Sequence, residues 1–117
     1  TNIQAKKSFS KYRDNDITLK FMTATMNTND QFEDKCPAVT HIDKTARPQV
    51  IFKEDDIFLW NLLTRWEEVS GELSLINTSF NAHEEPIICN EEESIKALLD
   101  KIVDVLIINE KILICRR

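Results

Sequence analysis

With 117 residues, 42% of them apolar, the chain is long enough to bury one core and too short for a two-domain enzyme. Its 15 basic and 20 acidic residues leave a net charge of −5, which disfavours partners bound by neutralising phosphates, nucleic acid above all. One glycine and three prolines exclude collagen-like, linker and low-complexity sequences, and no apolar run is long enough to cross a membrane.

The cysteines and histidines predict reduced thiols and no bound metal. Cys36, Cys89 and Cys115 are odd in number and widely spaced, which fits neither a disulfide framework nor a zinc site. His41 and His83 lie far apart and near none of the spacings that metal sites use. Since no apolar leader precedes them, we expect a cytoplasmic protein with no metal of its own.

In chain order, residues 1–18 contain few large apolar residues in no regular period, so we expect a poorly anchored arm or a truncated element. Residues 19–26 and 39–51 alternate between apolar and polar side chains and predict strands, with a loop between them. Pro48 places the second strand at an edge or a bend.

Residues 55–70 predict a helix, because apolar residues recur every three or four positions and Gly71 follows as a C-cap. Asn90 and the three glutamates after it predict the start of a second helix, with Glu93 placed to complete a capping box. Short strands are expected at 73–77 and 86–89, and a hairpin at 104–115. The fold class is therefore α+β, a twisted mixed β-sheet with two main helices.

Two polar stretches interrupt this pattern of core positions. On the predicted strand 39–51, His41, Asp43, Thr45 and Arg47 share one face, and Arg47 can hold a phosphate or carboxylate with two parallel bonds. Alternatively, these alternating polar side chains form only the solvent-exposed face of the strand.

The second polar stretch lies at the end of the predicted strand 73–77. Asn77, Ser79 and Asn81 alternate along the chain, so they would offer two amides and a hydroxyl on one side. With the first stretch, they would suit an anion with several oxygens. An ordinary turn is the alternative interpretation of this stretch.

Four stretches resemble the C-terminal domain of the NodU/CmcH/TobZ O-carbamoyltransferases. The similarity spans roughly Phe21 to Leu113 and preserves the order and spacing of these segments: Pro37-Ala38-Val39-Thr40-His41-Ile42-Asp43-Lys44-Thr45-Ala46-Arg47-Pro48-Gln49, Leu75-Ile76-Asn77-Thr78-Ser79-Phe80-Asn81, Glu85-Pro86-Ile87 and Asp104-Val105-Leu106-Ile107-Ile108. The resemblance implies that residues 19–117 are a fragment of that family's YrdC-like domain.

The resemblance also implies a function. In that family the YrdC-like domain binds carbamoyl phosphate and ATP and forms carbamoyladenylate, and a Kae1-like N-terminal domain, which holds iron, transfers the carbamoyl group to an acceptor hydroxyl. Carried over by motif, Arg47 would contact phosphate, and Ser79 and Asn81 would complete the anion site. His41, Asp43, Thr45 and Thr78 would line the pocket.

The chain departs from the family pattern in three places. Family members usually carry glycine where this chain has Lys44 and Glu84, so a left-handed backbone at either position would carry strain. The family's basic motif with a phenylalanine-arginine-proline-phenylalanine core has no match in residues 1–20. We therefore expect a carbamoyltransferase part that does not turn over alone.

Two other functions stay open. A degenerate, non-catalytic module would use its sheet and the helix that carries Trp60 as an interaction surface. A tRNA-modification protein of the YrdC type is a more distant alternative, because it shares the Ser-x-Asn feature, but the net charge of −5 argues against it.

Overall fold

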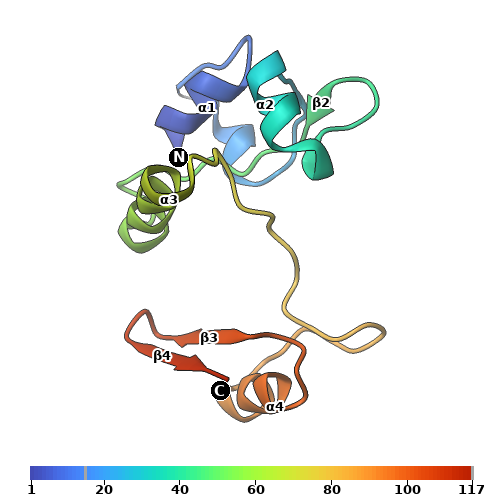
Figure 1. Cartoon of the computed structure of the whole chain (residues 1–117), viewed down its shortest axis with the longest axis vertical. Helices are drawn as coiled ribbons and strands as arrows, with labels where there is room; N and C mark the ends of the chain where they lie inside the picture. Colours follow the sequence, from blue (N-terminus) through green and yellow to red (C-terminus); the bar gives the residue numbers. More distant parts are fainter. Residues whose placement is uncertain (15, 117) are drawn as a thin grey trace. The chain divides into compact units, whose positions relative to one another are not determined.

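The computed structural model describes residues 1–14 and 16–116, in which the chain divides into two compact units, Thr1–Ile76 and Asn77–Arg117 (Figure 1). Asn15, inside the predicted segment 1–18, and Arg117, the end of the predicted domain 19–117, lie outside the described residues. Helices and strands occur in both units, as an α+β chain requires. The single mixed sheet is wrong, because the strands described form two separate antiparallel pairs, β1-β2 and β3-β4.

Helix α1 (Asn2–Ser8) opens the first unit and belongs to its core. Ala5 and Phe9 are 4% and 7% exposed, and the Gln4 side chain donates to the Leu63 carbonyl at 2.9 Å. The helix is therefore anchored, unlike the loose arm expected from its sparse apolar residues. The division of the chain into 1–18 and 19–117 stays a prediction.

The strands predicted for the first unit shrink to two residues each, β1 (Met26–Asn27) and β2 (Thr45–Ala46), paired antiparallel. Residues Ile17–Lys20 form a 3-10 helix instead, because the Asp16 carboxylate accepts hydrogen bonds from the Thr18 amide and hydroxyl. Alternation of apolar and polar residues indicates only that some side chains are buried and others are exposed. A 3-10 turn that buries Leu19 and leaves Ile17 exposed satisfies this pattern as well as a strand does.

Helix α2 (Asp30–Lys35) lies where a loop was expected. Its N-cap is Asn29, whose side chain accepts from the Phe32 amide at 3.0 Å, and two acids stand in its first turn. A second 3-10 helix, Pro37–Val39, follows. The start signal of α2, Asn29 followed by acids, is present in the sequence within the stretch predicted as a loop.

Helix α3 (Ile57–Ser70) confirms the prediction for 55–70, with Asp56 as N-cap and Gly71 as a left-handed C-cap at φ 75°. None of the side chains of α3 is buried, although its amphipathic pattern is typical of a helix that packs on a core. Leu59, Leu62 and Trp66 are 38%, 39% and 37% exposed. The apolar stripe that was expected to face the core is therefore open on the first unit.

One cluster of buried apolar side chains forms the core of the first unit, while Ala97, Leu98 and Leu106 are buried in the second. The rings of Phe9 and Phe32 pack against each other in this cluster, with their centroids 5.3 Å apart. Its members are Ala5, Phe9, Leu19, Phe32, Cys36, Ala46, Val50, Phe52 and Leu73.

The second unit consists of α4 (Glu91–Leu99), β3 (Val105–Ile108) and β4 (Ile112–Cys115). Asn90 caps α4 as predicted, and the Glu93 carboxylate reaches back to the Cys89 amide at 2.9 Å, one residue before the cap. The hairpin is confirmed, with Leu106 opposite Ile114 and a three-residue connection, 109–111, in which Asn109 and Glu110 have positive φ.

The strands predicted at 73–77 and 86–89 are wrong. No ladder partner pairs with either stretch among the described residues, and without one an apolar run stays irregular. No helix in residues 1–14 and 16–116 combines the length and the apolar character needed to span a bilayer.

Candidate functional site

The stretch that carries His41, Asp43, Thr45 and Arg47 is a tight turn leading into β2. The Lys44 amide donates to the His41 carbonyl at 2.9 Å, and the His41 amide donates to the Thr45 carbonyl at 2.7 Å. Lys44 adopts φ 62°, the left-handed conformation expected at this usual glycine position. The predicted extended strand is therefore bent through a turn before Thr45.

Residues far from the turn hold Lys44 in this conformation. The Thr28 amide and hydroxyl both donate to the Lys44 carbonyl, at 3.0 Å and 2.7 Å. The Lys44 ammonium lies 3.1 Å from the Glu33 carboxylate, whose hydrogen bond and charge raise the pKa of Lys44 above its ordinary value. Sequence patterns missed both supports, because Thr28 is 16 residues from Lys44 and no local signal links them.

Three of the predicted site residues make a hydrogen-bonded chain inside the turn. The Thr45 hydroxyl donates to Asp43 Oδ1 at 2.7 Å, and the Thr45 amide reaches the same oxygen at 3.2 Å. His41 Nδ1 lies 2.9 Å from Thr45 Oγ1. The Thr45 hydroxyl bond is the main cause that lowers the pKa of Asp43 below its ordinary value.

Arg47 follows directly after β2. Ala46 is 3% exposed and points into the core, whereas Arg47 is exposed. In the part of the chain that the structure describes, its guanidinium makes no ion pair or hydrogen bond. An unpaired guanidinium beside a turn fixed by many hydrogen bonds is suited to hold an oxyanion.

The second polar stretch belongs to the second unit and is a closed loop. The Ile88 amide donates to the Phe80 carbonyl at 2.9 Å, and the Asn81 side-chain amide donates to the carbonyls of Ala82 and Glu85, both at 3.0 Å. Glu84 adopts φ 65°, again at a usual glycine position. Asn81 thus commits both amide hydrogens to shaping this loop.

Thr78 and Ser79 precede the loop and are exposed. Within residues 1–14 and 16–116, neither hydroxyl has a hydrogen-bond partner. His41, Asp43, Thr45 and Arg47 lie in the first unit, and Thr78, Ser79 and Asn81 lie in the second. Hydrogen bonds join His41, Asp43 and Thr45 to one another, whereas no hydrogen bond among the described residues joins Arg47 to them or joins Thr78 and Ser79 to Asn81.

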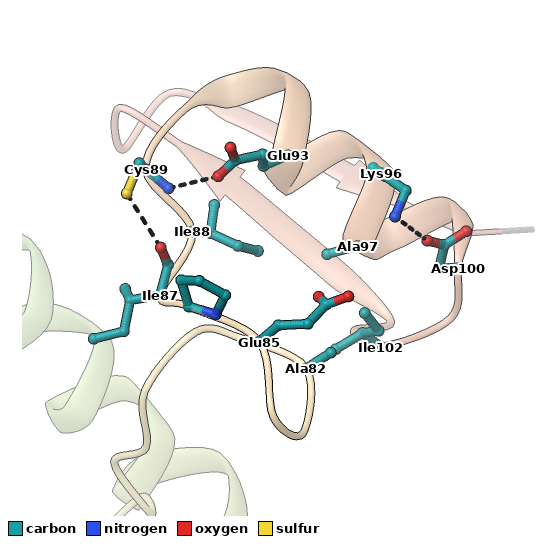
Figure 2. Close-up of a pocket in the computed structure, with 11 residues that line it drawn as sticks. Ala82, Glu85, Ile87, Ile88, Cys89, Glu93, Lys96, Ala97, Asp100 and Ile102 are labelled. Carbon is teal, nitrogen blue, oxygen red and sulfur yellow. Dashed lines mark hydrogen bonds and ion pairs between the residues drawn. The ribbon is translucent and has the colours of Figure 1, made fainter.

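A pocket of about 310 Å³ lies in the second unit (Figure 2). Ile88, Ala97 and Ile102 form an apolar part of its wall. Three carboxylates, on Glu85, Glu93 and Asp100, face one ammonium, on Lys96, which is already paired with Asp100 at 3.2 Å. This surplus of negative charge does not suit a phosphate, and no predicted site residue lines the pocket.

No group of three His, Cys, Asp or Glu side chains among the described residues is arranged to hold a metal ion. The side chains of the two polar stretches carry hydroxyls, amides, an imidazole, a guanidinium and the Asp43 carboxylate, and such groups serve as hydrogen-bond partners of a polar ligand.

Comparison with known proteins identifies a protein family to which the sequence is similar. The model named Carbamoyltransferase C-terminus matches residues 2–115. The chain is 36% identical over 89 residues to the uncharacterized protein MJ1058 of Methanocaldococcus jannaschii, covering 76% of this chain and 15% of that protein. It is 28% identical over 90 residues to Nodulation protein NolO of Bradyrhizobium diazoefficiens, covering 77% of this chain and 16% of that protein.

A third relative is Nodulation protein U of Rhizobium tropici, 36% identical over 63 residues, which are 54% of this chain and 11% of that protein. The match to the family model begins at residue 2 and so includes α1, which lies before the stretches that resemble the family by motif. The chain spans about a sixth of the length of the relatives it matches most fully.

Proposed function

The chain belongs to the carbamoyltransferase C-terminus family, and from that premise we propose that it is the part of a cytoplasmic O-carbamoyltransferase that binds carbamoyl phosphate and ATP. In this proposal water releases carbamate and inorganic phosphate from carbamoyl phosphate, and a carbamate oxygen then attacks the α-phosphorus of ATP, so that carbamoyladenylate forms and pyrophosphate leaves. A Kae1-like N-terminal domain of the same protein, which holds iron, passes the carbamoyl group to an acceptor hydroxyl. A YrdC-like fold is part of the proposal.

The observation that carries the proposal is the free guanidinium of Arg47 beside the hydrogen-bonded turn at His41–Thr45. Carbamoyl phosphate is a dianion, and its reaction with ATP concentrates further negative charge. A fixed donor aimed at such charge commonly contributes about 3 kcal/mol to transition-state stability. Arg47 supplies two parallel N–H donors for this purpose.

Ser79 and Thr78 are the proposed hydroxyl donors of the second unit, because both are exposed and their hydroxyls have no partner among the described residues. Asn81 contributes through the loop that it closes, since its amide hydrogens are bonded to Ala82 and Glu85. Direct contact between Asn81 and the anion stays a prediction.

A second function is favoured by two observations. The stripe on α3 is open on the first unit, and Lys44 and Glu84 accept left-handed strain where the family uses glycine. Both fit a degenerate module that retains the fold for an interaction surface and has lost its ligand. Binding experiments separate this module from the ligand-binding protein.

The test is an amide-shift titration of the chain with carbamoyl phosphate and with ATP. The proposal predicts that amides near Arg47 shift as ligand is added, and that Arg47→Ala abolishes these shifts. Amides near Thr78 and Ser79 are followed separately, as the readout of the second unit. Arg65→Ala is the matched control, because Arg65 is exposed on α3 and paired with Glu68 at 2.7 Å. A spectrum that is unchanged at millimolar ligand contradicts the proposal and favours the non-catalytic interaction module.

A further inference from the structure

The turn at His41–Thr45 contains a chain of three side chains that ends on a free ring nitrogen. Asp43 Oδ1 accepts from the Thr45 hydroxyl at 2.7 Å, and Thr45 Oγ1 lies 2.9 Å from His41 Nδ1. Both bonds have the length of ordinary hydrogen bonds between side chains. The direction of the second bond follows from counting protons.

A threonine hydroxyl carries one hydrogen and can donate once. An ionised carboxylate only accepts, so the Thr45 hydrogen points to Asp43. Thr45 Oγ1 is then left with lone pairs alone, and the bond to His41 forms only when Nδ1 carries the proton. The neutral ring of His41 is therefore held in its Nδ1–H form.

The Asp43 carboxylate, at which this chain of hydrogen bonds ends, stays charged at neutral pH. The Thr45 hydrogen bonds keep the pKa of Asp43 below its ordinary value. The backbone bonds between His41 and Lys44 and the Thr28 bonds to Lys44 hold the turn that brings the three side chains together.

In this form His41 Nε2 is a bare acceptor. The residue is exposed, and no group in residues 1–14 and 16–116 bonds to Nε2. Arg47, two residues beyond Thr45, offers donors only. Nε2 of His41 is thus a neutral acceptor in the same turn region as the donors of Arg47, in addition to the charged carboxylate of Asp43.

We propose that Asp43 and Thr45 are positioning residues that hold His41 with its proton on Nδ1, so that Nε2 accepts a hydrogen bond from the amide end of carbamoyl phosphate. The part about the ligand rests on the proposed function. Carbamoyl phosphate has acceptors at its phosphate end and two N–H donors on its carbamoyl nitrogen. An acceptor nitrogen distinguishes it from acyl phosphates that lack these donors.

The first experiment locates the ring protons by long-range nitrogen–proton NMR of the chain at pH about 9, where free imidazole is neutral. His83 is the internal reference, because its side chain is 97% exposed and its Nε2 faces Glu84 at 3.9 Å, which favours a proton on Nε2. The proposal predicts Nδ1–H for His41. A proton on His41 Nε2, as in His83, overturns it.

Variants separate the positioning role from general stability. Thr45→Ser keeps the hydroxyl and must keep the Nδ1–H signature, whereas Thr45→Val removes it and must shift the proton toward Nε2. Valine suits a strand position, and unchanged amide shifts in the core around Leu19 confirm that this variant folds. An unchanged His41 signature in a folded Thr45→Val overturns the proposal.

The second experiment compares carbamoyl phosphate with acetyl phosphate, which has a methyl group in place of the amide nitrogen. The chain must prefer carbamoyl phosphate, and Thr45→Val must reduce that preference about fivefold. Equal affinities in the unaltered chain overturn the role of Nε2 while leaving phosphate binding by Arg47 intact. If neither compound binds, the proposed function fails and the His41 signature still decides the positioning role.

Discussion

The side-chain amide of Gln4 donates to the backbone carbonyl of Leu63, 2.9 Å away, and ties helix α1 to helix α3 across 59 residues of chain. Gln4 is 2% exposed, so water does not replace this bond when it is lost. Because α3 has no buried side chain, the contact is one of the few that hold it to the first unit.

Gln4→Ala is therefore expected to lower the free energy of unfolding by about 1 to 2 kcal/mol. Trp60 and Trp66 on α3 report the transition in urea by fluorescence. Gln31→Ala, an exposed glutamine on α2, is the matched control and is expected to change little. Equal losses in the two variants would mean that the contact across the helices adds nothing.

Tyr12 packs beside the core with its hydroxyl buried, and this hydroxyl has no partner in hydrogen-bonding geometry among the described residues, although the Asp14 carboxylate is close enough for its charge to act on it. A buried hydroxyl that has lost its water costs about 1 kcal/mol or more. Tyr12→Phe is thus expected to raise the urea midpoint. A lower midpoint would show that the hydroxyl has a partner.

The same residue gives the chain a pH dependence. Burial, followed by the charge of Asp14, raises the pKa of Tyr12 to about 12 from 10.0. Because the unfolded state loses the Tyr12 proton at a lower pH than the folded state does, the free energy of unfolding is unaffected by this ionisation below pH 10 and falls as the pH rises toward 12. Urea midpoints between these values must fall for the unaltered chain more steeply than for Tyr12→Phe.

Glu84 adopts φ 65° in the loop closed by Asn81. Left-handed backbone costs a residue with a Cβ about 1 to 2 kcal/mol, and glycine avoids this cost. Glu84→Gly is expected to slow amide exchange in the second unit, read at the buried Leu106. Glu85→Gly, at the neighbouring position without a positive φ, is the control and must not do so.

Asp43 titrates below its ordinary value because Thr45 bonds to its charged form. The stabilisation is present above pH 3.8 and is lost as the pH falls through the lower pKa of the folded state. Carbon NMR of the Asp43 carboxyl is expected to show this depression, and Thr45→Val must bring the pKa back toward 3.8. Identical titrations in both chains would show that Thr45 does not hold the carboxylate.

Elements with local start and stop signals were predictable. Helices α3 and α4 carry their caps at Asp56, Gly71 and Asn90, and the hairpin turns through Asn109 and Glu110, both at positive φ. The short strands were not predictable, because β2 needs partners 18 and 20 residues away and alternation alone does not supply them. A stretch with the alternating pattern of a strand forms turns when no second strand pairs with it.

The residues of the candidate site could be named from the sequence, but of its geometry only the backbone conformation at two positions could be predicted. The motif resemblance indicated that positions 44 and 84 need a left-handed backbone, and both have it. The chain from Asp43 to Thr45 and His41 was hidden, because strand alternation would have spread these side chains along one face. The supports from Thr28 and Glu33 depend on tertiary folding.

The most direct test of the account is the dissociation constant of carbamoyl phosphate for the unaltered chain, Arg47→Ala and Arg65→Ala, measured by calorimetry at one salt concentration. A charged hydrogen bond contributes about 1.5 to 3 kcal/mol, so Arg47→Ala is expected to bind about 10- to 100-fold more weakly, with Arg65→Ala unchanged. Equal affinity in all three chains, or no binding to the unaltered chain, would contradict the assignment of Arg47 as the phosphate ligand.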